Sequence, residues 1–107
     1  MRLVIYGLGD VAASVVRDMV AQRPGGYRMI GFIADDPAMA RTRMQGYPVV
    51  GAYDTLISSI NEGRVDLVVI TQSLEPNRLE ELRMLCAESQ VALERLHFTL
   101  DQLVVTP

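Results

Sequence analysis

Lysine and tryptophan are absent from this 107-residue chain, and cysteine and histidine occur once each. All ten basic residues are therefore arginine, which excludes a Walker lysine, a Schiff-base lysine and a Tyr-x-x-x-Lys pair. The lone Cys86 excludes an internal disulfide and favours a buried structural thiol. With His97 as the other single residue, a metal centre would have to rest mainly on carboxylates, and no such cluster occurs. No G-x-S-x-G motif supports a hydrolytic triad, so we identify no catalytic residue and no metal ligand.

Long apolar runs and an excess of basic charge are also missing. No run approaches the roughly 20 residues of a membrane-spanning helix. The formal charge of −3 gives no electrostatic case for binding nucleic acid. Half of the residues are hydrophobic, as expected for one compact domain that covers residues 1–107. The chain is short for a Rossmann enzyme with a separate substrate domain. We expect the protein to lie in the cytoplasm.

The first twenty residues predict a buried strand, a glycine turn and an amphipathic helix. The strand is the unbroken apolar run from Leu3 to Tyr6. Apolar residues then recur at helical spacing between Val11 and Val20. The segment between them, Gly7-Leu8-Gly9-Asp10-Val11-Ala12, matches G-x-G-x-x-G/A in its required strand-turn-helix context.

Each small residue of this motif has a physical task. Gly7 permits the tight turn, Gly9 lets the backbone approach a pyrophosphate, and Ala12 leaves room for the helix to pack on the strand. An anion would bind the free N–H groups at the positive end of the helix dipole. The Asp10 carboxylate would repel a phosphate unless it points away, so a ligand hydroxyl is its better partner. The alternative is that two glycines merely close a turn in a domain that binds nothing.

A second strand, residues 27–34, ends in two carboxylates. Asp35 lies 28 residues beyond Gly7, somewhat more than the separation of roughly 20 at which a dinucleotide fold places its ribose-binding acid. The other interpretation is that Asp35 and Asp36 cap the turn before Pro37. Both hold if one carboxylate caps while its neighbour faces the ligand.

The rest of the chain continues the alternation of strands and helices. Arg41 and Arg43 follow in a polar segment, where they are solvated or reach a ligand phosphate. The patterns then predict an edge strand at 46–52, a helix at 55–62 with Asp54 as its N-cap and Gly63 as its stop, a central strand at 66–71, a helix from Glu75 to Ser89-Gln90, a strand nearer the edge at 91–98 and a helical turn at 100–105. We predict an α/β, Rossmann-like three-layer fold with a mainly parallel sheet of about five strands. Thr71, Gln72 and Ser73 should then lie beside the glycine turn, where the strand order reverses.

Four segments in this order resemble a known family: 3–10, 31–37, 45–51 and 65–71. The family is the Rossmann-like nucleotide-binding domain, also called CoA-binding-like, of bacterial polysaccharide-biosynthesis proteins. There it lies on the cytoplasmic side after transmembrane helices, and accompanies nucleotide-sugar dehydratases and epimerases or polyprenyl-phosphate sugar-phosphate transferases. The resemblance assigns Gly7, Gly9 and Asp10 to the glycine turn and Asp35 and Asp36 to the acidic strand end. Residues 71–73 depart from the family's small-residue and proline pattern.

The function predicted from these features is a nucleotide-binding module that is not catalytic by itself. Its ligand, NAD, NADP, CoA or a nucleotide-sugar such as a UDP-sugar, would contact Gly7, Leu8, Gly9, Asp10, Val11, Asp35, Asp36, Thr71, Gln72 and Ser73. The carboxylate at the second strand favours NAD over NADP, a preference that Arg41 and Arg43 could reverse. The resemblance implies a parent dehydratase, epimerase or transferase at the inner membrane, and homo-oligomers are a further prediction. Two alternatives remain: a ligand-free scaffold or dimerisation domain for envelope-sugar enzymes, and a small NAD-dependent oxidoreductase, which lacks an acid-base constellation.

Overall fold

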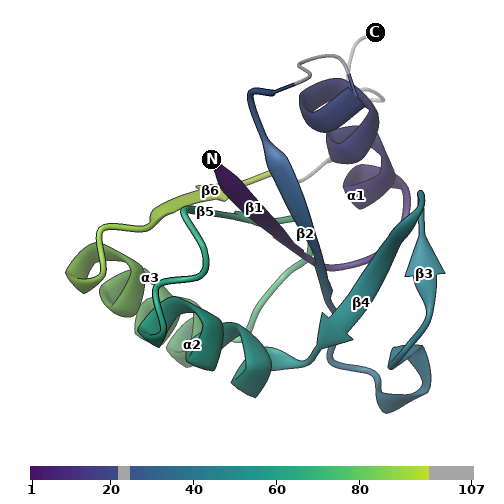
Figure 1. Cartoon of the computed structure of the whole chain (residues 1–107). Helices are drawn as coiled ribbons and strands as arrows, with labels where there is room; N and C mark the ends of the chain where they lie inside the picture. The colour runs from purple at the N-terminus through teal and green to yellow at the C-terminus, as the bar shows by residue number, and fades with distance from the viewer. Residues whose placement is uncertain (22–24, 97–107) are drawn as a thin grey trace, which may run out of the picture.

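The computed structural model describes residues 1–21 and 25–96, which form one sheet with helices on both faces (Figure 1). In chain order the elements are β1 (Arg2–Tyr6), α1 (Asp10–Val15) continued by a π-helix η1 (Val16–Ala21), β2 (Arg28–Ile33), a 3-10 turn η2 (Pro37–Met39), β3 (Arg43–Met44), β4 (Tyr47–Gly51), α2 (Tyr53–Asn61), β5 (Leu67–Ile70), α3 (Pro76–Glu88) and β6 (Ala92–Arg95). None of these helices is long and apolar enough to cross a membrane.

The sheet has the strand order β3-β4-β2-β1-β5-β6. All neighbouring strands are parallel except β3, which is antiparallel to β4. The chain runs outward from β1 through β2 to β4, then crosses back through α2 to β5 on the other side of β1. The order therefore reverses between β1 and β5, the position at which ligands bind in open α/β sheets. The mainly parallel α/β fold that the sequence predicts is confirmed.

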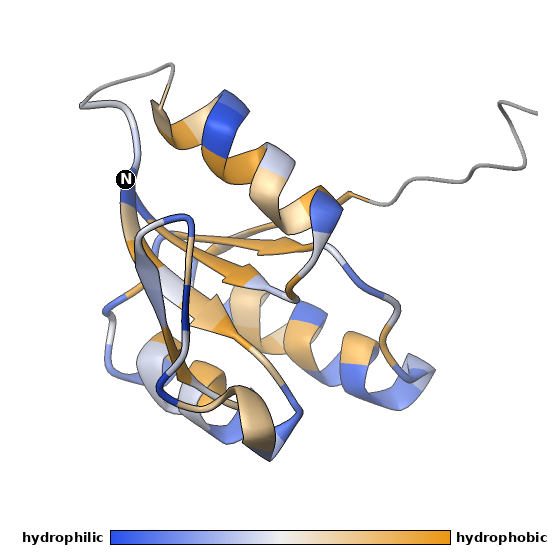
Figure 2. Ribbon diagram, turned by 90° about the vertical axis from the view of Figure 1, so that its right-hand side faces the viewer, coloured by the Kyte–Doolittle hydropathy of each residue, from blue (hydrophilic) through white to orange (hydrophobic). Residues whose placement is uncertain are grey.

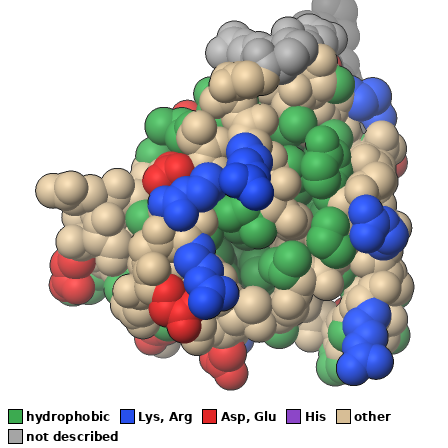
Figure 3. All heavy atoms as spheres, in the orientation of Figure 1, with side chains coloured by type: hydrophobic (Ala, Val, Ile, Leu, Met, Phe, Trp, Pro, Cys, Tyr) green, Lys and Arg blue, Asp and Glu red, His purple; other side chains and the backbone are tan. Residues whose placement is uncertain are grey.

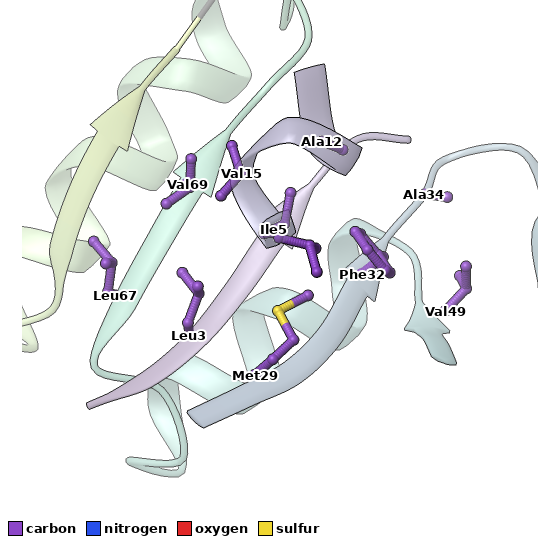
Figure 4. Packing of buried hydrophobic residues seen from close by; sticks show 11 residues of the cluster. Leu3, Ile5, Ala12, Val15, Met29, Phe32, Ala34, Val49, Leu67 and Val69 are labelled. Carbon is purple, nitrogen blue, oxygen red and sulfur yellow. The ribbon is translucent and has the colours of Figure 1, made fainter. Parts of the chain in front are cut away.

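The core has two halves because the side chains of each strand alternate between the faces of the sheet. On one face Leu3 and Ile5 of β1 pack with side chains of β2 and β5 against Ala12 and Val15 of α1 (Figure 4). On the other face Val4 and Tyr6 join the inward side chains of α2 and α3. Figure 2 shows the resulting three layers, with orange strands between α1 and the other two helices.

Helices α2 and α3 each bury one apolar stripe. Leu56 and Ile60 of α2 are 0% and 2% exposed, and Leu82 and Cys86 of α3 are 0% and 1% exposed. Burial raises the pKa of the Cys86 thiol to about 11. The prediction of a buried structural thiol is therefore confirmed.

Two local predictions were wrong. The strand at 46–52 is not an edge strand, because Gln45 and Gly46 both have positive φ (53° and 84°) and fold β3 back onto β4 as a sixth strand. Asp54 is not the N-cap of α2, because the helix begins one residue before it and Ala52 holds the cap position. The first helix continues to Ala21 as expected, but its second half is a π-helix.

Other predicted boundaries are confirmed. Gly63 ends α2 with φ 70°, and Gln90, with φ 58°, follows the end of α3. Strand β6 pairs with β5 through Arg95, nearer the edge than β5. The rest of the predicted strand and the helical turn at 100–105 lie outside the described residues.

Charges are dispersed over the face shown in Figure 3, where basic and acidic side chains are interspersed with hydrophobic ones. Exposed ion pairs of the chain include Arg2 with Asp66 at 3.0 Å and Arg64 with Glu62 at 3.1 Å.

Candidate functional site

The glycine turn lies at the carboxyl end of β1, and its two glycines differ in their surroundings. Gly7 has φ 120°, and its N–H donates to the Ile33 carbonyl at 2.9 Å. A Cβ at Gly7 would overlap the Thr71 hydroxyl and lie 3.2 Å from Gln72 Oε1. Gly9 has φ 109°, and a Cβ there would meet nothing within 4 Å. Gly7 thus closes a tight junction between strands, whereas Gly9 borders open space.

Gly9 is also the N-cap residue of α1. The first bond of the helix runs from the Ala13 N–H to the Gly9 carbonyl at 2.9 Å. The N–H groups of the first turn, which begins at the exposed Asp10, precede this bond and form the positive end of the helix. Ala12 is fully buried against the sheet, and Leu8 packs on the same cluster. The backbone therefore has open space beside Gly9, and Ala12 lets the helix pack closely on the sheet.

The two carboxylates after β2 have different partners. Asp36 Oδ1 accepts the Ala38 N–H at 2.9 Å and caps the turn η2. Asp35 instead accepts the Tyr6 hydroxyl at 2.7 and 2.9 Å and the Gln72 amide at 3.4 Å. Arg78 completes its surroundings with an ion pair of 3.3 Å. One carboxylate caps while its neighbour turns to the α2 and α3 side of the sheet.

Tyr6, Arg78 and Tyr53 form a polar network that the sequence analysis missed. Arg78 Nη1 donates to the Tyr6 hydroxyl at 3.1 Å, and its guanidinium stacks 4.4 Å from the centre of the Tyr53 ring. The Tyr53 hydroxyl in turn donates to Glu81 at 2.7 Å. Burial, together with Asp35, raises the pKa of Tyr6 to about 12, so at neutral pH its hydroxyl remains a donor to Asp35. One signal was available: a tyrosine in a buried strand needs a partner for its hydroxyl.

Helix α3 places Arg78 at this network. The Glu75 carboxylate caps the helix by accepting the N–H groups of Asn77 and Arg78, both at 3.1 Å. Pro76 occupies the first turn, where its missing N–H costs no helical bond. Glu75 and Pro76 together define the start of the helix, and this places Arg78 in its first turn.

Thr71 and Gln72 lie beside the glycine turn, as the topology predicts. Thr71 is buried, and both its N–H and its hydroxyl donate to the Tyr6 carbonyl, at 2.9 and 3.0 Å. Gln72 lies next to Gly7 and reaches Asp35, so its side chain connects the ends of β1, β2 and β5. Ser73 is exposed and lines a cavity of about 190 Å³ together with Gln72, Leu74, Leu79 and Arg95.

The remaining candidate residues differ in their contacts and in their exposure. Arg43 donates to the Gly46 carbonyl at 2.6 Å and so stabilises the turn between β3 and β4, whereas Arg41 is exposed. Val11 is half-buried in the first turn of α1. Among the described residues no group of three His, Cys, Asp or Glu side chains could hold a metal ion. The site as described is thus suited to hold a ligand through backbone N–H groups and a partly exposed carboxylate.

Several solved structures share this fold. UDP-D-quinovosamine 4-dehydrogenase from Vibrio fischeri superimposes with a TM-score of 0.69 at 24% identity, over 96% of this chain and 82% of that one. RSP, a Rex-family repressor, superimposes in its complex with β-NADH with a TM-score of 0.65 at 12% identity, over 97% of this chain and 57% of that one. At sequence identities this low, these similarities show a shared fold.

Sequence comparison adds a family. The probable polysaccharide biosynthesis protein EpsC of Bacillus subtilis (strain 168) is 23% identical over 99 residues, which are 91% of this chain. The match covers 17% of EpsC, so this chain corresponds to a small part of that protein. Residues 1–94 match the CoA-binding domain family, and this match includes the glycine turn, both carboxylates after β2 and residues 71–73. The chain therefore belongs to the CoA-binding domain family, and its sequence is related to polysaccharide biosynthesis proteins.

Proposed function

We propose that this domain binds a nucleotide across the carboxyl ends of β1, β2 and β5, with the ligand's pyrophosphate at Gly9. The observation that carries the proposal is the convergence of these three strand ends on an open space. Gln72 links Asp35 to the glycine turn, while nothing lies within 4 Å of a Cβ at Gly9. Backbone can therefore approach a phosphate at Gly9, beside the N–H groups that begin α1.

The ligand ribose would bind at Asp35. Three donors already surround this carboxylate, and the contact from Gln72, at 3.4 Å, is the longest of them. A ribose hydroxyl can replace the Gln72 amide without disturbing the shorter contacts from Tyr6. An unmodified ribose suits a carboxylate better than a 2′-phosphate does, which favours NAD or a nucleotide-sugar over NADP. The neighbouring Arg78 and the exposed Arg41 instead favour a 2′-phosphate, and therefore NADP.

In this proposal the domain holds the nucleotide, and the chemistry belongs to another part of a longer cytoplasmic protein of polysaccharide biosynthesis. Two observations support the proposal. The chain contains no lysine, so it lacks the Tyr and Lys pair used by nucleotide-sugar dehydratases. It also corresponds to only 17% of the related EpsC.

A thermal-shift screen against NAD, NADP, CoA, UDP and several UDP-sugars tests the proposal. A ligand at about 100 times its dissociation constant should add roughly 2.7 kcal/mol to the free energy of unfolding. Gly9→Val should abolish the ligand-induced shift by filling the space beside the first turn of α1. The matched control is Gly63→Val, because Gly63 also has positive φ and open surroundings but lies at the far end of α2. A shift that survives in Gly9→Val, or the absence of any shift in the unaltered chain, would contradict the proposal.

A scaffold role is the second candidate, and a groove between α2 and α3 favours it. Ile57, Met84 and Leu85 line a cavity of about 330 Å³ there, and Met84 is 51% exposed. If this groove docks a second copy of the chain, Met84→Glu should turn dimers into monomers in analytical ultracentrifugation. Ligand-induced thermal shifts should then be absent from the unaltered chain.

A further inference from the structure

The cavity beside β6 extends the proposed ligand site past β5. It measures about 190 Å³, and its walls are Gln72, Ser73, Leu74, Leu79 and Arg95. Gln72 also contacts Asp35 and lies next to Gly7, so the cavity adjoins the glycine turn through this one side chain. It is smaller than the roughly 300 Å³ of typical small-molecule pockets and therefore suits one part of a larger ligand.

Arg95 gives this cavity its charge. Leu93 packs on the α2 and α3 cluster, and strand alternation brings Arg95, two residues later, to the same face of β6. Glu94 belongs to the opposite face, and none of the acidic side chains in residues 1–21 and 25–96 lines the cavity. Arg2, Arg64, Arg78 and Arg83 form ion pairs, whereas Arg95 has neither an ion pair nor a side-chain hydrogen bond to any other residue in 1–21 or 25–96.

The other walls complement the guanidinium. The Ser73 hydroxyl can donate or accept, and the Gln72 amide offers donors next to it. Leu74 and Leu79 provide an apolar surface on the α3 side. An arginine fork with a hydroxyl and an amide matches an oxyanion, and the leucines suit the apolar face of a sugar ring.

We propose that this cavity binds an oxyanion at the far end of the nucleotide ligand, with Arg95 as the specificity-determining residue. The oxyanion is a carboxylate on the sugar of a nucleotide-sugar, or a phosphate. This inference rests on the proposed function for the rest of the ligand. The inference favours a nucleotide-sugar with an anionic end over NAD⁺, because the nicotinamide ring of NAD⁺ is cationic and would be repelled by the Arg95 guanidinium.

A titration of the ¹⁵N-labelled chain, followed by amide chemical shifts, tests the oxyanion pocket. The probes are UDP-glucuronate, UDP-glucose, free glucuronate and inorganic phosphate. We expect the amides of Ser73, Leu74 and Arg95 to respond to UDP-glucuronate at about tenfold lower concentration than to UDP-glucose, the advantage of one charge-assisted contact. Arg95→Gln should remove that difference. Arg28→Gln, the matched control at the exposed start of β2, should preserve it.

The arms separate the possible failures. Shifts at Gly9 and Asp10 with equal response to both UDP-sugars would support nucleotide binding and overturn the oxyanion pocket. A response of Ser73 and Arg95 to free glucuronate or phosphate that Arg95→Gln abolishes, without shifts at Gly9 for any nucleotide, would support the pocket and contradict the proposed function. Comparison of the glucuronate and phosphate arms identifies the source of the oxyanion. Shifts that persist in Arg95→Gln, or no shift with any of the four probes, would overturn the inference.

Discussion

The parallel strands begin along one side of the sheet, here called the amino edge, and end along the opposite side, the carboxyl edge. Each of these two sides holds a carboxylate paired with an arginine, yet their surroundings differ. At the amino edge Asp66 accepts the backbone N–H of Arg2 at 2.7 Å and its guanidinium at 3.0 and 3.1 Å. The same residues are joined by a backbone bond of 2.9 Å from the Asp66 N–H to the Arg2 carbonyl. The amino edge has no open space at this point, because the charged pair bridges the starts of the neighbouring strands β1 and β5.

At the carboxyl edge the corresponding carboxylate is Asp35. Asp35 and Asp66 have equally exposed side chains, at 39% each, so exposure does not distinguish them. The difference lies in the space around them. Asp35 adjoins a glycine turn with open volume at Gly9 and, through Gln72, a cavity. Of the two edges, we therefore expect only the carboxyl edge to bind a ligand.

The largest predicted effect separates the two glycines of the turn. Gly7→Ala should destabilise the domain by about 3 kcal/mol or more, because strain at positive φ is added to overlap with the buried Thr71. Gly9→Ala, which carries the strain alone, should cost about 1 to 2 kcal/mol. Urea unfolding of both variants measures the difference. Equal losses would contradict the close packing of Gly7.

Alkaline pH should weaken the carboxyl edge. The pKa of Tyr6 rises from 10.0 to about 12 on folding, so between these values the unfolded chain releases a proton that the folded chain retains. The stability from Tyr6 is complete below pH 10 and is lost as the pH rises through 12, a loss of about 2 to 3 kcal/mol. Burial and Glu81 raise the pKa of Tyr53 as well, and burial raises that of Cys86 to about 11, so the double variant Tyr53→Phe/Cys86→Ala isolates the share of Tyr6. Urea unfolding at pH 9 to 12 checks this, and a flat profile in the double variant would contradict the buried phenol.

Removal of the Tyr6 hydroxyl should cost less than the glycine overlap. Tyr6→Phe leaves Asp35 and Arg78 with each other but without their shared buried partner, an expected loss of about 1 to 2 kcal/mol. The loss should appear in urea midpoints at pH 7. Tyr27→Phe, at a half-buried tyrosine on the other core cluster, is the control and should change little. An unchanged midpoint in Tyr6→Phe would indicate that the network is not formed.

The amino edge gives the smallest effect. Arg2→Gln should lower the urea midpoint less than any variant above, because the side chains of its ion pair with Asp66 are exposed and the pair is screened by salt. Arg2 lowers the pKa of Asp66 from 3.8 to about 2, so the pair's contribution is present above pH 3.8 and is lost as the pH falls through 2. Urea unfolding of Arg2→Gln at pH 7 and pH 2 should show a smaller difference between the variants at pH 2. A larger penalty at the acidic pH would contradict this pairing.

The fold was predictable where a pattern is local. The apolar run of β1, the glycine turn and the capping pair Glu75-Pro76 each lie within a few residues, and the structure contains all three elements. The two-residue strand β3 was missed because two residues show no periodicity. Its signal was the Gln45-Gly46 pair, since a turn with two positive φ values joins antiparallel strands.

The site was predictable only in part. The positions of Gly9, Asp35 and Gln72 follow from topology, because the carboxyl ends of parallel strands share one edge. The network of Tyr6, Asp35 and Arg78 does not follow, since its members lie 29 and 72 residues apart. The roles of residues 7–11, 35–36 and 71–73 in ligand binding remain predictions.

Chemical-shift mapping tests the difference between the two edges most directly. The ¹⁵N-labelled chain is titrated with the nucleotide that gives the largest thermal shift among NAD, NADP, CoA, UDP and UDP-sugars. We predict that amides of Gly7 to Val11, Asp35 and Gln72 shift in proportion to ligand bound, while those of Arg2, Arg28 and Asp66 remain unchanged. Shifts centred on the amino edge, or none at the glycine turn, would contradict the assignment of the ligand site to the carboxyl edge.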